Sequence, residues 1–397
     1  MIVVKRKNTN HQHSEGVKCH PFWILMLQYY LDFYNNASLS GLRKSHAFLL
    51  KCCIVYICWL VLIDRQTYQK IMWNKIGKRI GKSLIVSAIV YLVICLVLIY
   101  WPINIEKNVK NYDYSSIKEN SKSDLGKEQW IKTRDNYKIF SRVYNSENKD
   151  LLILIHGSGS ESRYLANLAD SIANQNIATV LTPDMRGHGR NGGKRGDVNF
   201  IGQLENDIED LIQYGKKNLG AKKIILAGHS SGGGFVLRFI GNPKNSKVDR
   251  AILLSPYLGH DAPTVKPNSG GWVKVAMKRI IGLSMINNVG FKSLNHLPVL
   301  FFNRPENIND KLQVPSYSFN MTINFNPKNH KGEINNINIP CLVLVGKQDE
   351  SFYPEQFPIT FKPAEKYVRL ELLDGVKHLD IVKSHKTFEI IEEWSKN

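Results

Sequence analysis

The chain of 397 residues changes its pattern of apolar and polar positions near residue 125. Residues 84–103 form one uncharged apolar run of about 20 residues, which is long enough to span a bilayer, and it ends in aromatic residues of the kind found at membrane interfaces. From residue 125 onward, short apolar runs alternate with stretches of helical spacing. The short runs are residues 151–155, 223–227, 249–255, 341–345 and 367–373, and the helical stretches include residues 163–174, 201–218 and 235–240.

This alternation predicts an α/β fold in which a mostly parallel sheet is covered by helices on both faces. Residues 137–144 alternate with a period of two after a polar turn, which predicts an antiparallel edge strand. Between residues 256 and 339 the alternation gives way to Pro-, Gly- and Asn-rich sequence with one basic amphipathic stretch at residues 272–286. Roughly 85 residues are too many for a simple connection between strands, so this segment is predicted to be an insertion.

A Gly-x-Ser-x-Gly motif, Gly228-His229-Ser230-Ser231-Gly232, stands between a predicted strand and a predicted helix. A serine at the tip of such a turn is held in a strained conformation that projects its hydroxyl clear of the sheet. Glycines on either side let the strand and the helix approach closely. The context predicts that Ser230 is a nucleophile, and the alternative is an ordinary glycine-rich turn.

The acid and the base that a serine nucleophile needs are expected downstream, at the ends of later strands. Asp349 follows the run at 341–345, and His378 follows the run at 367–373. Asp349 can hold one imidazole nitrogen while the other accepts the proton of Ser230. Read separately, Asp349 is a turn cap and His378 a surface histidine. The fallback candidates are the acids Glu350 and Asp374 and the base His385.

An oxyanion hole is predicted from a second strand end. The run at 151–155 leads into His156-Gly157-Ser158-Gly159, as expected of a buried strand that turns into a loop. The backbone N–H groups of Ser158 and of Ser231, the residue after the nucleophile, are the predicted donors to a developing alkoxide. Without the serine motif, His156-Gly157 is an ordinary strand-end turn.

Together with Asp184-Met185-Arg186-Gly187-His188-Gly189, these motifs resemble the α/β-hydrolase superfamily over about residues 125–397. Within it the chain looks most like the serine aminopeptidase and monoacylglycerol lipase-like (lysophospholipase) branch. The resemblance implies an α/β-hydrolase fold, a structural role for Asp184, Arg186 and His188, and a cap over the pocket at about residues 256–339. Arg190 stands where many relatives carry Ser or Thr.

The apolar side chains of the insertion have two interpretations. They line a groove for an acyl chain, or they form the small core of the cap itself. The residues concerned are Trp272, Met277, Phe291, Phe301 and Phe302.

The residues flanking the long apolar run predict an uncleaved membrane anchor at residues 72–103. Basic residues precede the run at Lys75, Lys78, Arg79 and Lys82. By the positive-inside rule the N-terminal side is cytoplasmic, and the hydrolase domain lies on the other side of the membrane. A cleaved signal peptide is the alternative, but the run is long for one and no small-x-small cleavage site follows. Residues 104–124 have the composition of a polar linker.

Residues 1–71 have two interpretations. Residues 47–63 are apolar but contain Lys51, and a second crossing there would reverse the orientation. Alternatively, the protein starts at Met72, because this methionine and the basic residues after it precede the apolar run as in a single-pass protein. We expect the start at Met72.

Charge and composition limit the classes of partner and cofactor that the protein is expected to bind. The formal net charge of +19 is concentrated at the front, where residues 1–82 hold 13 Lys and Arg against three acidic residues. This concentration fits attraction to anionic lipid better than nucleic-acid binding, because no nucleic-acid motif is present. The sequence contains no metal-ligand spacing and no phosphate-binding glycine loop, so it predicts no cofactor. It also offers no disulfide framework after residue 125.

These observations predict a membrane-anchored serine hydrolase that cleaves a lipid or small acyl ester through an acyl-enzyme on Ser230. A serine aminopeptidase is the alternative, and it would need an acidic group in the cap to hold the substrate amine. Asp261, Glu306 and Asp310 are the acids available there. A non-catalytic binding protein that keeps the fold is the third possibility. The ester substrate is inferred by analogy with the family, since fold by itself does not determine function.

Overall fold

The computed structural model describes residues 72–104, 125–303 and 310–396. The predictions for residues 1–71, and nearly all of the linker at 104–124, lie outside the described residues. The chain divides into two compact units, Met1–Ile85 and Val86–Asn397, and the sheet belongs to the second. Most of the long apolar run lies in a helix, α3 (Met72–Ile99), which begins before the basic residues that precede the run.

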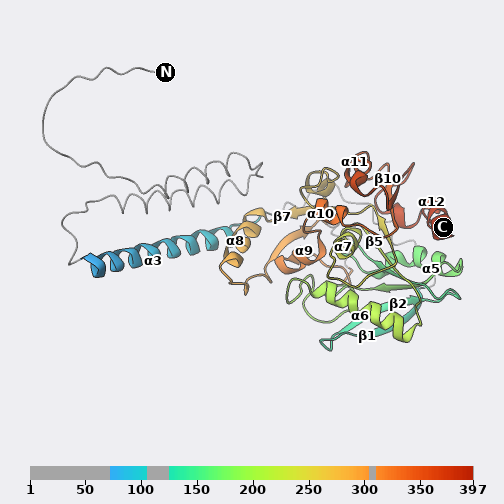
Figure 1. Ribbon diagram of the computed structural model, residues 1–397, viewed down its shortest axis with the longest axis horizontal. Coiled ribbons are helices and arrows are strands. Elements are labelled where there is room, and N and C mark those ends of the chain that lie inside the picture. The colour runs from blue at the N-terminus through green and yellow to red at the C-terminus, as the bar shows by residue number, and fades with distance from the viewer. Residues whose placement is uncertain (1–71, 105–124, 304–309, 397) are drawn as a thin grey trace, which may run out of the picture. The chain divides into compact units, whose positions relative to one another are not determined.

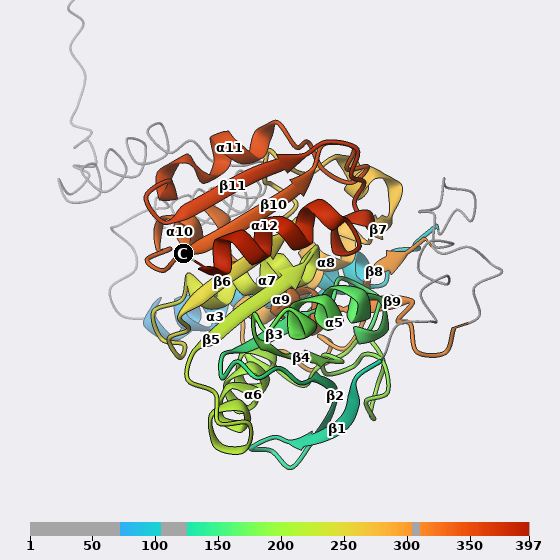
Figure 2. The ribbon, with the colours of Figure 1, turned by 90° about the vertical axis from the view of Figure 1, so that its right-hand side faces the viewer.

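The sheet has eight strands in the order β1-β2-β4-β3-β5-β6-β10-β11 (Figure 2). They are β1 (Lys127–Lys132), β2 (Lys138–Tyr144), β3 (Leu151–Ile155), β4 (Thr179–Pro183), β5 (Ile224–His229), β6 (Arg250–Leu254), β10 (Cys341–Gly346) and β11 (Val368–Leu373). Strand β2 is antiparallel to both of its neighbours, and every pairing from β4 to β11 is parallel. The prediction of a mostly parallel sheet is confirmed.

The prediction that residues 137–144 form an edge strand is wrong in one respect. Strand β2 is antiparallel, but β1 pairs along its outer side and takes the edge of the sheet. Only Ile131 of β1 is buried, and both ends of the strand are charged. Because a strand that buries so little of itself has no continuous apolar pattern, the sequence gives little sign of it.

Helices cover both faces of the sheet, and adjacent residues of one strand reach opposite faces. On β3, Ile153 belongs to the core cluster that includes α6 (Gln203–Asn218) and α7 (Ser231–Ile240). Its neighbours Leu152 and Leu154 belong to the cluster that includes α5 (Ala166–Asn174) and α12 (His385–Lys396), which lie in front of the sheet in Figure 2. Burial on both sides explains why the central strands read as uninterrupted apolar runs.

The predicted insertion lies between β6 and β10 and has its own small sheet, coloured yellow to orange in Figure 1. Its elements are β7 (Val273–Val275), α8 (Met277–Asn288), β8 (Pro298–Phe302), β9 (Ser316–Ser318), α9 (Phe319–Phe325) and α10 (His330–Asn335). The remaining short elements are α11 (Gln356–Phe361) and 3-10 helices at Ser162–Leu165, Pro267–Gly271, Lys362–Ala364 and Asp380–Val382. The basic stretch at 272–286 therefore forms β7 and most of α8.

The apolar side chains named for the insertion differ in their burial. Trp272 stacks on Phe302 with ring centroids 5.4 Å apart, and both pack against the main core. Met277 and Phe291, in contrast, are 42% and 47% exposed. This exposure contradicts the small core for these two residues. The groove stays a prediction for them, because side chains that line an open groove are exposed.

One buried ion pair joins the helix after the serine motif to the rest of the domain. Arg238 on α7 donates from Nε to Glu205 of α6 at 2.8 Å, and its guanidinium also donates to the carbonyl oxygens of Ile323 and Asn326. The exposed fractions of the two side chains are 2% and 8%. Arg238 therefore links the helices of the sheet to the last part of the insertion.

We expect Arg238→Ala to destabilise the protein by about 3–5 kcal/mol, because removing one partner of a buried pair leaves the other without compensation. Glu205 would keep only the Lys328 ammonium, which lies 3.9 Å away. Urea unfolding of the detergent-solubilised full chain, followed by circular dichroism, measures the loss. Arg369→Ala is the matched control, since its pairs with Glu371 and Glu393 lie at the surface and are worth about 0–1 kcal/mol. Equal losses in both variants would contradict the assignment.

Candidate active site

Ser230 lies on a sharp turn between β5 and α7. Its backbone has φ 56° and ψ −121°, a conformation that residues other than glycine rarely adopt. The turn is possible because strand and helix meet backbone to backbone. A Cβ atom on Gly228 would lie 2.4 Å from the carbonyl of Gly232, and one on Gly232 would lie 2.5 Å from the carbonyl oxygen of Ile155. Both positions therefore require glycine.

Backbone hydrogen bonds hold this turn in place. The N–H of Ser230 donates to the carbonyl of Leu254 at the end of β6, at 2.9 Å. The carbonyl of Ser230 accepts from the N–H groups of Gly234 and Tyr257, each at 3.0 Å. The surrounding structure thus determines a strained conformation that the chain would not keep alone.

The structure brings the candidate residues Ser230, His378 and Asp349 together in one hydrogen-bonded chain. The Oγ atom of Ser230 lies 3.0 Å from Nε2 of His378, and Nδ1 of His378 lies 2.8 Å from Oδ2 of Asp349. Asp349 and His378 follow β10 and β11, which are neighbours in the sheet, so their loops meet at the same rim. The other carboxylate oxygen of Asp349 accepts from the N–H groups of Ser351 and Phe352.

The electrostatics suit a proton acceptor next to the serine. Burial raises the pKa of Asp349, but the adjacent His378 and the hydrogen bonds to the carboxylate outweigh it, and the pKa lies below its usual value. Asp349 is therefore ionised at neutral pH and keeps a proton on Nδ1 of His378. That tautomer leaves the lone pair of Nε2 directed at Ser230.

The fallback residues have other contacts. Glu350 accepts a hydrogen bond from the backbone N–H of His378 at 2.9 Å, so it holds the loop and not the ring. Asp374 pairs with Lys347 at the surface, and His385 pairs with Glu389 at the start of α12. The sequence did not indicate this role of Glu350, because a contact with a backbone amide does not depend on the type of the partner residue.

Two tyrosines hold the loop that was predicted to supply the oxyanion hole. The N–H of Gly157 donates to the hydroxyl of Tyr164 at 2.6 Å, and the N–H of Gly159 donates to the hydroxyl of Tyr317 at 2.8 Å. Ser158 lies between these two anchored residues, and its hydroxyl bonds to that of Ser231. The structure therefore brings the predicted Ser158 and Ser231 together beside Ser230.

Each tyrosine is backed by a buried histidine. Tyr164 lies 2.9 Å from Nδ1 of His229, whose Nε2 donates to the carbonyl of His378 at 3.0 Å. Tyr317 lies 2.6 Å from Nε2 of His188. Burial, reinforced by the nearby His378, lowers the pKa of His229 to about 3, and burial together with His156 lowers the pKa of His188 well below its usual value. Both rings are neutral, so each has a nitrogen that can accept a hydrogen bond from the tyrosine hydroxyl.

His188 lies in the segment whose structural role the resemblance implied, but Tyr164, Tyr317 and the role of His229 were not identified from the sequence. His229 occupies a variable position of the serine motif, which gave it a place but no role. Tyr164 and Tyr317 carry no local signal, and Tyr317 is 158 positions away from the glycine that it binds. In a sequence, a tyrosine that positions a loop cannot be told from one that only packs in the core, because its hydroxyl partner is unknown.

The segment at 184–189 makes several contacts with other parts of the domain. Asp184 accepts from the N–H of Ser162 at 2.9 Å and from the N–H of Arg190 at 2.8 Å. Arg186 pairs with Asp207 at 2.6 Å. Because the contact of Arg190 with Asp184 uses the backbone, the departure from Ser or Thr at this position leaves that contact unchanged.

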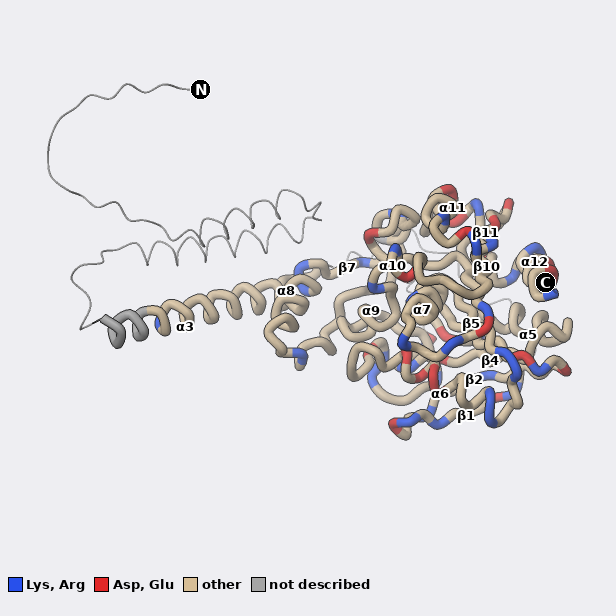
Figure 3. Tube along the Cα trace, in the orientation of Figure 1, with Lys and Arg blue, Asp and Glu red and all other residues tan. Residues whose placement is uncertain are grey.

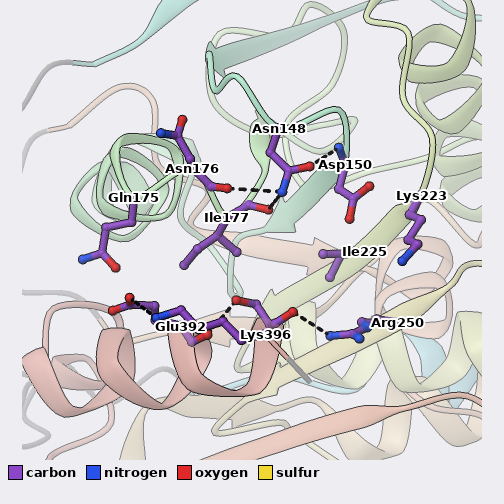
Figure 4. A pocket seen from close by; sticks show the side chains of 11 residues that line it. Asn148, Asp150, Gln175, Asn176, Ile177, Lys223, Ile225, Arg250, Glu392 and Lys396 are labelled. Atoms are coloured by element: carbon purple, nitrogen blue, oxygen red, sulfur yellow. Dashed lines mark hydrogen bonds and ion pairs between the residues drawn. The ribbon is translucent and has the colours of Figure 1, made fainter.

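A second feature, a pocket of about 190 Å³, is lined by the residues drawn in Figure 4. Asp150 precedes β3, Lys223 precedes β5 and Arg250 begins β6, so this pocket lies at the amino ends of the strands. The serine, histidine and aspartate follow carboxyl ends. Within the described part of the chain, no group of three His, Cys, Asp or Glu side chains could hold a metal ion.

Residues 146–381, more than half of the chain, match the family model for serine aminopeptidase, S33. Among curated proteins, a proline iminopeptidase of Saccharolobus solfataricus is 32% identical over 33% of this chain and 39% of its own length. A protein phosphatase methylesterase of Debaryomyces hansenii is 27% identical over 30% of this chain and 32% of its own length. The chain thus spans about a third of the length of the curated relatives it matches.

Two solved structures are similar over most of their length. A soluble variant of monoglyceride lipase from Saccharomyces cerevisiae has a TM-score of 0.51 and 18% identity, and covers 72% of this chain and 97% of its own. The α/β hydrolase GrgF from Penicillium has a TM-score of 0.50 and 18% identity, and covers 68% and 97%. At this identity the similarity shows that the two share the fold.

We expect the protein to lose stability as the pH falls below about 6.5, because three buried histidines are neutral when folded and take up protons on unfolding. Burial lowers the pKa of His156, His188 and His229, so their contribution is complete above the unfolded value and is lost towards pH 3, the folded value of His229. The slope is up to about 1.4 kcal/mol per pH unit for each ring. Urea unfolding of the full chain in detergent at about pH 7 and about pH 5 measures it.

His229→Gln is expected to flatten this pH dependence by the share of one histidine. The control is His385→Gln, because the side chain of His385 is 85% exposed. If both variants kept the slope of the unmodified protein, the buried rings would not be its source.

Proposed function

Because the chain belongs to the serine aminopeptidase S33 family, in the lysophospholipase-like branch of the α/β-hydrolases, we propose that it is a membrane-anchored serine hydrolase that cleaves carboxylic esters through an acyl-enzyme on Ser230. The observation that carries the proposal is the unbroken hydrogen-bonded chain from Ser230 through His378 to the ionised Asp349. A binding protein that kept only the fold would have no need for this alignment.

In the first half of the reaction, Ser230 Oγ attacks the ester carbonyl as its proton passes to Nε2 of His378. Asp349 stabilises the imidazolium that forms. The tetrahedral intermediate collapses, the C–O bond to the alcohol breaks, and His378 returns its proton to the departing alkoxide. Water then repeats the sequence on the acyl-enzyme, with His378 as general base, and releases the carboxylic acid and the free serine.

The backbone N–H groups of Ser158 and Ser231 are the proposed donors to the oxyanion. Two observations support this assignment. Ser231 is the first residue of α7, where N–H groups are free of helical partners, and Tyr164 and Tyr317 hold the loop around Ser158. Donors fixed in advance need no reorganisation when the negative charge develops.

An ester is a better proposal than a peptide because neither of the two candidate acids that the structure describes in the insertion is a buried, unpaired carboxylate for a substrate amine. Asp310 is paired with Arg163 at 2.5 Å, and the side chain of Asp261 is 69% exposed. Glu306 lies outside the described residues. The relatives include both a methylesterase and an iminopeptidase by name, so they do not favour either.

The proposed organisation is an anchor at 72–103, a linker at 104–124 and a hydrolase domain at 125–397, with residues of about 256–339 acting as its cap. Among the described residues, one helical stretch, Ile80–Ile99, is long and apolar enough to cross a membrane. Figure 3 shows no charged residue on α3 after Lys82. The basic residues before this stretch support a cytoplasmic N-terminal side.

The topology can be tested with reporters fused to the C-terminus of the full chain. We expect a reporter that is active only outside the cytoplasm to be active, because the positive charges lie on the N-terminal side of the helix. The paired fusion carries a reporter that works only in the cytoplasm. Activity of that second fusion would reverse the proposed orientation and support a second crossing.

Turnover of p-nitrophenyl esters tests the mechanism. Ser230→Ala and His378→Ala are each expected to lower kcat by about 10⁴–10⁶-fold, and the double variant should lose little more, because the residues act as a unit. Asp349→Asn should fold normally but lose about 10⁴-fold, since an amide cannot stabilise the imidazolium. Aminoacyl anilides, assayed in parallel, distinguish the peptidase.

The matched control is Ser231→Ala, which removes a neighbouring hydroxyl and keeps the backbone N–H, so it should be mild. Fluorophosphonate labelling gives an independent readout. Full labelling and esterase activity in Ser230→Ala would show that the nucleophile lies elsewhere.

A further inference from the structure

The C-terminal half of α3 packs against α8, the first helix of the insertion. The hydroxyl of Tyr91 donates to the carbonyl of Met285 at 2.7 Å. A Cβ atom on Gly282 would lie 2.8 Å from the carbonyl oxygen of Cys95, so the two helix backbones are in contact there. The side chains that form this cluster are Cys95, Ile99, Leu283, Met285, Ile286, Val299 and Phe319.

The two helices run antiparallel. Along α3 the contacts move from Tyr91 to Cys95 to Ile99, and along α8 their partners move back from Met285 to Gly282 to Arg279, whose Nε donates to the carbonyl of Ile99 at 2.8 Å. The pairing therefore covers about two turns, or about 12 Å of α3. Close approach at a small residue is typical of helix pairs inside membranes.

The length of the apolar run makes this pairing informative. The last charge before the run is Lys82, so residues 83–99 are available to cross the bilayer, a length of about 25 Å at the lower limit for a span. If α8 held residues 91–99 in water, only residues 83–90 would remain. A segment of about 12 Å cannot cross a membrane.

The composition of α8 fits the inside of a leaflet. Its charges, Lys278 and Arg279, lie at the end of α3, where the ammonium of Lys278 sits 3.4 Å from the ring centroid of Trp101. The next twelve residues, from Ile280 to Phe291, are uncharged. Lys292 follows, and a lysine side chain is long enough to carry its charge back towards the interface.

Several apolar side chains on α3 and in the turn after α8 are exposed, as expected of a surface that contacts lipid. Val289 and Phe291, in the turn after α8, are 61% and 47% exposed. On α3, Val93 and Val97 remain more than half exposed although their neighbour Cys95 is fully buried. The helix pair thus shows apolar side chains outward, which is costly in water and favourable in hydrocarbon.

Resting on the membrane anchor of the proposed function, we propose that α8 and the turn to Phe291 are inserted into the same leaflet as residues 91–99 of α3. The partner of this surface is the acyl chains of that leaflet. The cap is then a membrane-embedded element paired with the anchor of its own chain.

This placement brings the active site close to the bilayer and defines the substrate class. Strand β8 begins at Pro298, whose carbonyl accepts from Arg279. Val299 belongs to the cluster with α3, and the ring of Phe302 lies 3.0 Å from a Cβ placed on Gly159 in the oxyanion loop. Three residues of a strand span about 10 Å. We infer that the substrate is a lipid ester drawn from this leaflet.

Photolabelling tests the insertion directly. The full chain is reconstituted in phosphatidylcholine vesicles, exposed to a lipid-soluble aryl diazirine and mapped by peptide mass spectrometry. We expect label in residues 84–97 and also in residues 280–291. Ile359 is the control for exposed apolar side chains in water, because it is 67% exposed on α11 and should stay unlabelled.

The outcomes separate the two proposals. Label in α3 without label in residues 280–291 would overturn the insertion of α8 and leave the anchor intact. No label in either segment would overturn the anchor itself.

A variant tests the pairing of the helices. Gly282→Leu places a side chain where the backbone of α3 lies, so residues 280–291 should lose their label while α3 keeps it. Ser284→Leu adds the same side chain one residue beyond the cluster residue Leu283 and should keep the label. Turnover of a water-soluble p-nitrophenyl ester reports that both variants are folded. Unchanged label in a folded Gly282→Leu would overturn the pairing.

Hydrolysis of a vesicle-embedded monoacylglycerol, measured against the soluble ester, tests the substrate class. Gly282→Leu should lose activity on the embedded lipid by a larger factor than on the soluble ester. Equal losses on both substrates would overturn the inferred route from the leaflet, whereas absence of activity on both in the unmodified protein would contradict the proposed esterase.

Discussion

The architecture of the active site depends on one close approach, where β5 and α7 meet backbone to backbone at the turn that carries Ser230. Two glycines make the turn possible, since a Cβ atom on Gly228 would overlap Gly232 of α7, and one on Gly232 would overlap the carbonyl oxygen of Ile155 at the end of β3. Hydrogen bonds from the ends of neighbouring segments hold the strained serine. Once β5 and its neighbours set the position of Ser230, the loops after β10 and β11 can reach it only from the same rim.

The loop at residues 156–159, beside Ser230, is supported from two sides of the fold. Tyr164 belongs to the main domain, whereas Tyr317 belongs to β9 of the insertion, and each holds one glycine of the loop. Buried neutral histidines complete both links. The insertion therefore does more than cover the sheet, because the geometry beside Ser158 requires a hydroxyl that only the insertion supplies.

The insertion also joins the site to the proposed anchor. Its strand β8 runs from the cluster formed with α3 to the aromatic side chain that contacts Gly159. A single short strand thus connects the element that we place in the membrane with the loop that we place around the oxyanion.

The sequence by itself determined what depends on local pattern. The parallel strands are buried on both faces and read as apolar runs, and Ser230, Asp349 and His378 each follow the end of such a run, so they could be identified before any contact was known. The tertiary structure alone decided what depends on meetings between distant segments. The tyrosine hydroxyls, the contact of Glu350 with a backbone amide and the pairing of α8 with α3 have no periodic signature. The edge strand β1 was missed because it buries a single side chain. The sequence could not decide between a groove and a small core for Met277 and Phe291, because apolar character in a sequence does not say which surface will cover it.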